Sequence, residues 1–230
     1  GLTAQRDAPG TVYGQLLSDS FDPEVMTEAL GARWEIARNY FKRFACVRYA
    51  HGLLDALEKI CAKQPGGRLA PDAIAAIEAR AHMPVGRLTE AAPANPLAAR
   101  VSIPFALATY IVSGSAGVDG FTQSAVDALQ TRDLAQRITV IEDADFTSQM
   151  PEKRPAQITI ALNDGSELSA RNDHIRGDLE APLSNKELHD KFDALATRTW
   201  PSQQVDAIWT ASTTMNAAND ISVFVDTLGS

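Results

Sequence analysis

The chain has 230 residues, of which 45% are hydrophobic and 22% are charged, so it is long enough for one large or two small domains with a buried core. This ordinary composition excludes a disordered chain, and no apolar run reaches the ~18 residues that a membrane-spanning helix needs. With 21 basic and 29 acidic residues the net charge is −8, which argues against a general nucleic-acid-binding protein. An anionic substrate would then need a local basic pocket.

The first residues, Gly1–Gly10, predict a polar loop without a signal-peptide pattern. Short helices are predicted at Thr11–Leu17 and at Pro23–Leu30, the second with Asp22 as its N-cap. The β-branched and aromatic residues of Trp34–Phe41 predict a strand.

A helix is predicted for His51–Cys61, because its apolar residues recur on one helical face. Lys42, Arg48 and His51 lie where the preceding strand would lead into this helix. Two cations beside the exposed N–H groups of a helix N-terminus suit an anionic ligand. A single histidine in a first turn is more often structural than catalytic, so residue types alone leave both interpretations open.

The middle of the chain contains a clear break at Gln64–Arg68 and an ambiguous segment at Pro71–Ala81. The alanines of this segment favour a helix, although its position between two breaks also suits a strand. Pro84–Asn95 predicts a long loop, and the almost wholly apolar Val101–Val112 predicts a buried helix with Pro104 in its first turn.

The next segments predict a short helix near Thr122–Leu129, a strand at Ile138–Ile141 and a hairpin at Pro155–Ala170. The hairpin has alternating apolar residues before the turn sequence Asn163-Asp164-Gly165. A capping box at Ser184–Glu187 begins a helix that should run to about Arg198. Two further helices follow, with apolar residues at helical spacing: Val205, Ile208 and Trp209, then Ile221, Phe224, Val225 and Leu228.

These elements together predict an α+β fold, a small and mostly antiparallel sheet with helices packed against it. The sequence contains no Gly-rich phosphate loop, no CxxC, no HExxH and no GxSxG. Asp143 and Asp145 resemble a pair of catalytic carboxylates, but an acidic loop after a strand is usually solvated. Cys46 and Cys61 form neither a disulfide framework nor a metal-site spacing, so a reduced, cytoplasmic setting is expected.

Five blocks, taken in order, resemble the C-terminal half of the MmgE/PrpD family. They cover roughly residues 31–196 and read WEIARNYFKRFACVRYAHGLLDAL, VSIPFALATYIVSGSAGVDGFT, RITVIEDADF, RPAQITIALNDGSEL and APLSNKELHDKFDALA. The family includes 2-methylcitrate dehydratase, cis-aconitate decarboxylase and iminodisuccinate epimerase. Its members have a large all-helical domain and a smaller α+β lid domain, with the active site in the cleft between them.

The resemblance implies three segments in this chain. Residues 1–30 would be the end of the helical domain, residues 31–182 the lid, and residues 183–230 helices that rejoin the helical domain. It also implies a strand at Pro71–Ala81, which we adopt over the helix that propensity favours. Most of the family's acid and base residues belong to the half that this chain lacks.

The block FKRFACVRYAH is similar to the family's lid motif, which implies catalytic roles for Lys42 and His51 at the substrate cleft. Arg48 matches a frequent arginine of the dehydratase-type motif and would bind substrate. Phe105 falls where many members carry a cleft tyrosine, so it is a candidate substrate contact that lacks the phenolic proton donor. It would otherwise be a plain core residue.

The resemblance implies a lyase or isomerase of small polycarboxylates, with 2-methylcitrate dehydratase-like chemistry in propionate catabolism favoured. Decarboxylase-like and epimerase-like chemistry remain alternatives. No metal and no organic cofactor is implied, and the expected partners are the substrate, the helical domain and a second copy in a homodimer. The chain would be nearly inactive without its helical domain. A non-catalytic structural or dimerisation module is the alternative from another class, and an independent hydrolase lacks any nucleophile motif.

Overall fold

The computed structural model describes residues 10–17 and 19–229, and its contacts divide the chain into two compact units, Gly1–Asn39 and Tyr40–Ser230. The family-based boundaries after residues 30 and 182 stay predictions. Among the described residues, no helix combines the length and the apolar character needed to cross a membrane.

The first unit contains short helices: η1 (Gly10–Leu16), a π-helix, and the 3-10 helices η2 (Pro23–Met26) and η3 (Glu35–Arg38). Asp22 caps η2, as expected, although the helix ends four residues earlier than predicted. The strand predicted at Trp34–Phe41 is wrong. Its large side chains are exposed and, within the described residues, no strand pairs with it, so its β-propensity has no sheet to join.

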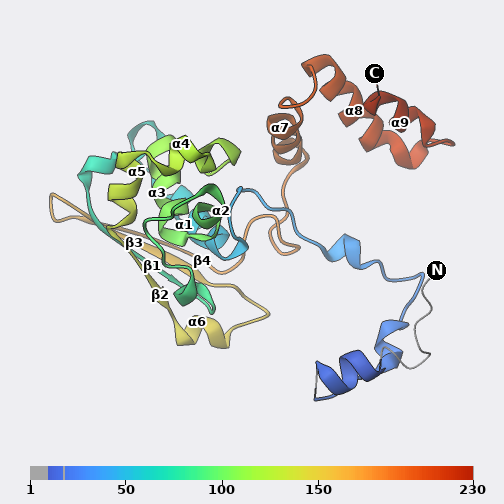
Figure 1. Cartoon of the computed structure of the whole chain (residues 1–230), viewed down its shortest axis with the longest axis horizontal. Coiled ribbons are helices and arrows are strands. Elements are labelled where there is room, and N and C mark those ends of the chain that lie inside the picture. Colours follow the sequence, from blue (N-terminus) through green and yellow to red (C-terminus); the bar gives the residue numbers. More distant parts are fainter. Residues whose placement is uncertain (1–9, 18, 230) are drawn as a thin grey trace. The chain divides into compact units, whose positions relative to one another are not determined.

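The second unit is built on a four-stranded sheet in the order β2-β1-β3-β4 (Figure 1). Its strands are β1 (Ile74–Ala81), β2 (Ile138–Glu142), β3 (Ala156–Leu162) and β4 (Glu167–Asn172). β1 pairs antiparallel with β3, and β3 with β4, while β1 and β2 run parallel. The α+β class is confirmed, and the sheet is mixed rather than wholly antiparallel.

The strand that the resemblance implied at Pro71–Ala81 is confirmed as β1, after a 3-10 turn (η6, Pro71–Ala73). β1 lies in the interior of the sheet, between β2 and β3, and both neighbours bond to its backbone. Ala79 and Ala81 are fully buried. Sheet pairing therefore overrides the helical propensity of the alanines.

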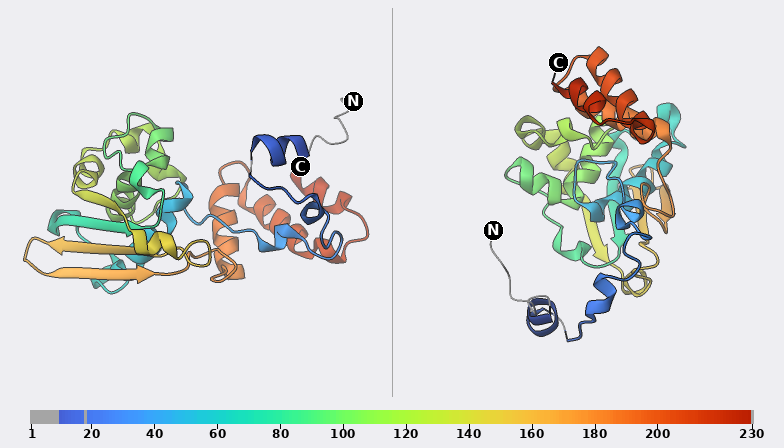
Figure 2. Two further views of the ribbon diagram at one scale, coloured as in Figure 1. Left: turned by 90° about the horizontal axis from the view of Figure 1, so that it is seen from below. Right: turned by 90° about the vertical axis from the view of Figure 1, so that its right-hand side faces the viewer.

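Helices cover one face of this sheet (Figure 2, left). α1 (His51–Cys61) begins after η4 (Arg48–Ala50) and packs on β3 and β4. The other helices of this layer are α2 (Pro96–Val101), α3 (Ile103–Ser113), α4 (Gln123–Val126) and α5 (Leu129–Ala135). Short turns η5 (Pro65–Gly67), η7 (Val85–Arg87) and η8 (Val118–Phe121) join them, and α6 (Ala144–Ser148) follows β2.

The buried helix predicted at Val101–Val112 begins two residues later. Ser102 caps α3 through a 3.0 Å bond from the Phe105 N–H to its hydroxyl, and Pro104 lies in the first turn. Gly114 ends the helix with φ 78°, a conformation that glycine adopts without strain.

Three helices close the chain: α7 (Asn185–Ala196), α8 (Ser202–Thr214) and α9 (Ser222–Leu228), with η9 (Met215–Ala217) between the last two. The capping box of Ser184 and Glu187 is confirmed. α9 has no buried residue, and its Ile221-Ser222-Val223 start is largely exposed.

Candidate functional site

The segment before α1 is held by backbone hydrogen bonds to two other parts of the helical layer. The Ala45 N–H donates to the carbonyl of Ala116 at 2.9 Å, and the Val47 N–H donates to that of Arg100 at 2.7 Å. These bonds fix the path of the chain from Lys42 to His51. The side chains predicted for the site therefore come from a well-positioned turn.

His51 is fully buried at the start of α1. Its ring contacts Phe44 edge-on at 5.3 Å, and its Nδ1 lies 3.4 Å from an Nη of Arg48. Its Nε2 has no hydrogen-bond partner among the described residues. Burial, followed by the nearby charge of Arg48, lowers the pKa of His51 to about 3, so the imidazole is neutral at pH 7.

Arg48 pairs with the buried carboxylate of Asp178, which also lies 3.6 Å from Arg154. The guanidinium stacks over the ring of Tyr40 at 4.3 Å. The single carboxylate of this network, that of Asp178, comes from a loop after β4, far from Arg48 in the sequence. Sequence reasoning found Arg48 but missed Asp178, because no local pattern links two residues so far apart.

A second ionic cluster lies further along α1. Arg43 donates to Asp55 at 2.7 Å and to Glu58 at 2.9 Å, and Asp55 also accepts a 2.8 Å bond from the Arg176 N–H. Burial raises the pKa of Asp55 to about 6, against the lowering effect of these bonds. The i, i+3 spacing of Asp55 and Glu58 is the one signal that could have revealed this cluster.

Lys42 is exposed, and its positive charge acts on the groups around it. It contributes, after burial and Arg48, to the low pKa of His51, and it lowers the pKa of Lys191 after burial does so. The charges of Lys42 and Arg48 both lower the pKa of His51, so each of the two cations lies within electrostatic range of its ring. Their catalytic roles stay a prediction.

Phe105 is fully buried in α3, with its ring 6.3 Å from that of Phe121. It lies in the core of this unit and does not reach the surface. This position agrees with the interpretation of Phe105 as a plain core residue, and a substrate contact would require its exposure.

Of the candidate carboxylate pair, Asp143 serves local structure. Asp143 caps α6 by accepting bonds from the N–H groups of Asp145 and Phe146 at 2.9 and 3.1 Å, and it lies 3.5 Å from Arg80. Cys46 and Cys61 are buried free thiols, and burial raises the pKa of Cys46 to about 12, which makes it unreactive.

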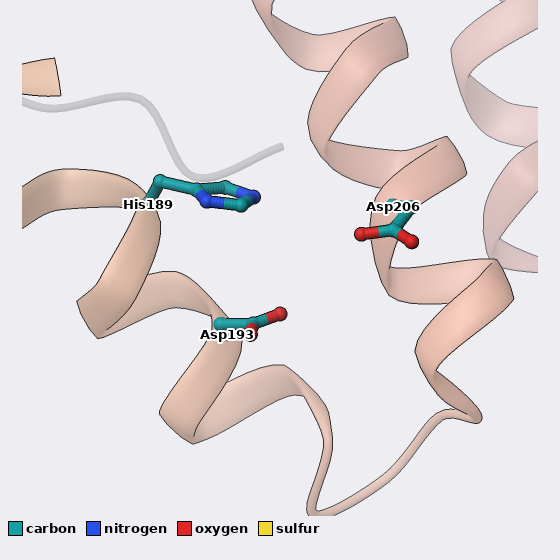
Figure 3. A group of neighbouring side chains, drawn as sticks. All are labelled: His189, Asp193 and Asp206. Atoms are coloured by element: carbon teal, nitrogen blue, oxygen red, sulfur yellow. The ribbon is translucent and has the colours of Figure 1, made fainter. Parts of the chain in front are cut away.

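His189, Asp193 and Asp206 bring one imidazole and two carboxylates within 4.8 Å of one another, from α7 and α8 (Figure 3). Such a set could hold a divalent cation. Asp206 is exposed, and the ring of His189 packs 4.6 Å from that of Trp209. Packing between the two helices therefore explains the position of the His189 ring without a bound ion. The sequence did not reveal this set, because its three residues lie on two separate helices.

The sequence profile of the MmgE/PrpD C-terminal domain matches residues 44–216. Three curated proteins illustrate the similarity. The cis-aconitate decarboxylase-like protein oryM of Aspergillus oryzae is 25% identical over 209 residues, which are 88% of this chain and 43% of that protein. Cis-aconitate decarboxylase of Aspergillus terreus is 21% identical over 90% of this chain and 44% of its own length. Cis-aconitate decarboxylase of Mus musculus is 26% identical over 54% of this chain and 25% of its own length. The chain thus spans less than half the length of these relatives.

Proposed function

This chain belongs to the MmgE/PrpD family, and from that membership we propose that it is the C-terminal lid portion of a lyase that acts on a small polycarboxylate. The lead reaction is loss of carbon dioxide from cis-aconitate, because the curated relatives carry that name. Loss of water from 2-methylcitrate, and epimerisation, are the alternatives within the family. The partner that completes the enzyme is the helical domain found in the family.

The segment from Lys42 to Arg48, which precedes α1 and carries positive charges, is the observation that supports this proposal. In a chain of net charge −8, Lys42 and Arg48 place two positive charges near a neutral imidazole, and of the two Arg48 is already paired with Asp178. Cations of this kind hold carboxylates and stabilise the negative charge that develops when a bond next to a carboxylate breaks. Lys42 is exposed and can meet a substrate directly.

His51 would exchange the proton. In decarboxylation the electron pair of the broken C–C bond stays on the carbon skeleton, which then takes up a proton as carbon dioxide leaves. Bound carboxylates would raise the low pKa of His51 by offsetting the charges of Arg48 and Lys42. Since the ring is fully buried, a substrate atom reaches it only if the side chains that cover it move.

The test compares this chain with the protein from the full reading frame that contains it. Carbon dioxide release from cis-aconitate and dehydration of 2-methylcitrate are measured for both. We expect the 230-residue chain alone to turn over neither substrate, and Lys42→Gln in the full protein to lower kcat/KM by roughly 10²–10³. Lys63→Gln, at an exposed lysine just after α1, is the matched control and should leave kcat/KM unchanged. Substantial turnover by the chain alone would place the active site within these residues, against the proposal.

A second candidate function is a non-catalytic dimerisation module. The exposed apolar side chains of α9 and its start favour it, with Ile221 and Val223 each more than 60% exposed. Size-exclusion chromatography with light scattering tests it. A dimer that Val223→Asp and Val225→Asp convert to monomer supports this function, and a monomer at all concentrations rejects it.

A further inference from the structure

A cavity of about 260 Å³ lies between α7 and the loop that follows α3. The loop contributes residues from Ser115 to Asp119, α7 contributes Lys191 and its neighbours, and Arg43 lines it from the segment before α1. The ion pair of Arg198 with Asp119, at 2.8 Å, joins the two walls. α7 therefore closes over a loop that is distant from it in the sequence.

The cations around this cavity are unequally neutralised. Arg43 is paired with two carboxylates of α1, and Arg198 is paired with Asp119. Lys191 is half-buried and, among residues 10–17 and 19–229, has no carboxylate partner. The charge of another cation, Lys42, lowers the pKa of Lys191, and Lys42 likewise has no ionic partner in the described part of the chain.

Two like charges near one another beside a concave surface are unfavourable unless an anion joins them. Burial and the charge of Lys42 both lower the pKa of Lys191, and a bound anion would offset both effects. The hydroxyl of Ser115 accepts a 3.1 Å bond from the Gly117 N–H, so its own proton remains available to a ligand.

We propose that the cavity between α7 and the loop 115–119 binds a small oxyanion, with Lys191 as its principal cation. Its assignment to a carboxylate of the substrate rests on the proposed function. Lys191 then belongs to substrate binding although it lies outside residues 31–182, the segment predicted to be the lid. Binding would also fasten α7 onto the loop 115–119, because the ligand contacts both walls.

The experiment measures binding to the 230-residue chain by calorimetry and by amide chemical shifts, with cis-aconitate, its neutral trimethyl ester and inorganic phosphate as probes. We expect saturable binding of cis-aconitate, no binding of the ester, and weaker binding at high salt. Lys191→Gln should weaken binding about tenfold, the loss of one charge-assisted hydrogen bond. Lys186→Gln, on the same helix with a side chain 82% exposed, is the matched control and should change it less than about twofold.

Cis-aconitate binding that depends on Lys191, with chemical-shift changes in the loop 115–119 and α7, supports the inference. Binding that is equal in Lys191→Gln and the parent chain, or no saturable binding below about 10 mM, overturns it. Phosphate binding that depends on Lys191 without cis-aconitate binding retains the oxyanion site and overturns its assignment to the substrate. Failure of the full protein to turn over cis-aconitate, with Lys191-dependent binding intact, rejects the proposed decarboxylation and leaves the oxyanion site standing.

Discussion

At the scale of single residues, His51 shows how the environment determines chemical behaviour. Its position in the first turn of α1 predicts a neutral imidazole from the helix dipole. In the structure, burial is the largest cause of its low pKa, and the charge of Arg48 comes next. Both causes favour the neutral imidazole, but burial also keeps solvent and substrate away from the ring unless the side chains that cover it move.

A pH dependence of stability follows from His51. Its pKa is about 3 when folded, against 6.5 when exposed, so between these values the unfolded chain binds a proton that the folded chain does not. Folding therefore loses stability as pH falls below 6.5. His51→Gln should remove this loss, so the difference in unfolding free energy between the two proteins should change by about 1.4 kcal/mol per pH unit.

Urea unfolding between about pH 4.5 and pH 7.5 measures that difference. Burial raises the pKa of Asp55 to about 6, so Asp55 makes the fold more stable as the pH falls from 6 to 3.8. Burial lowers the pKa of His82, so His82 makes the fold less stable at low pH, as His51 does. Asp55 and His82 are present in both the parent and His51→Gln, so their effects cancel in the difference between the two unfolding free energies. A difference in unfolding free energy that stays constant with pH would contradict the low pKa of His51 in the folded chain.

At the scale of elements, the loop after β4 completes the site. Gly177 accepts a bond from the Phe41 N–H at 3.0 Å, next to Asp178, the partner of Arg48. Its φ is 95°, and a Cβ there would lie 2.3 Å from the Phe41 carbonyl oxygen. This loop and the segment before α1 can approach only because residue 177 has no side chain.

Gly177→Ala should therefore destabilise the fold by more than backbone strain alone. Gly165, in the hairpin turn, has φ 85° with nothing near its Cβ position, so Gly165→Ala serves as the matched control. We expect a cost of about 1 kcal/mol for the control and about 3 kcal/mol or more for Gly177→Ala. Chemical denaturation measures both, and equal costs would show that the contact with Phe41 is unimportant.

At the scale of the whole molecule, the hairpin and the last helix differ sharply in packing. β3 has three fully or almost fully buried side chains, those of Ala156, Ile158 and Ile160, whereas α9 has none. Amide exchange should therefore be slow in β3 and fast in α9. Exchange measured by mass spectrometry tests this, and equally slow exchange in both would mean that α9 is covered in solution, as by a second copy.

The sequence by itself determined the elements whose signals are local. The 3.6-residue periodicity of α1, the Asn163-Asp164-Gly165 turn and the capping box of α7 depend on neighbouring residues, and each is confirmed. The family resemblance, carried by the blocks from Trp34 to Ala196, is confirmed by the profile match. It also supplied β1, which propensity alone misassigned.

Only the tertiary structure decided which distant residues meet. A strand needs a neighbour, so β1 formed between two strands, while Trp34–Phe41 did not form one, because no strand of residues 10–17 and 19–229 lies beside it. The pairing of Arg48 with Asp178, the burial of His51 and Phe105, and the approach of Lys191 to Lys42 join segments far apart in the chain. Local patterns carry no information on such contacts, because burial and charge pairing depend on the packing of the whole unit.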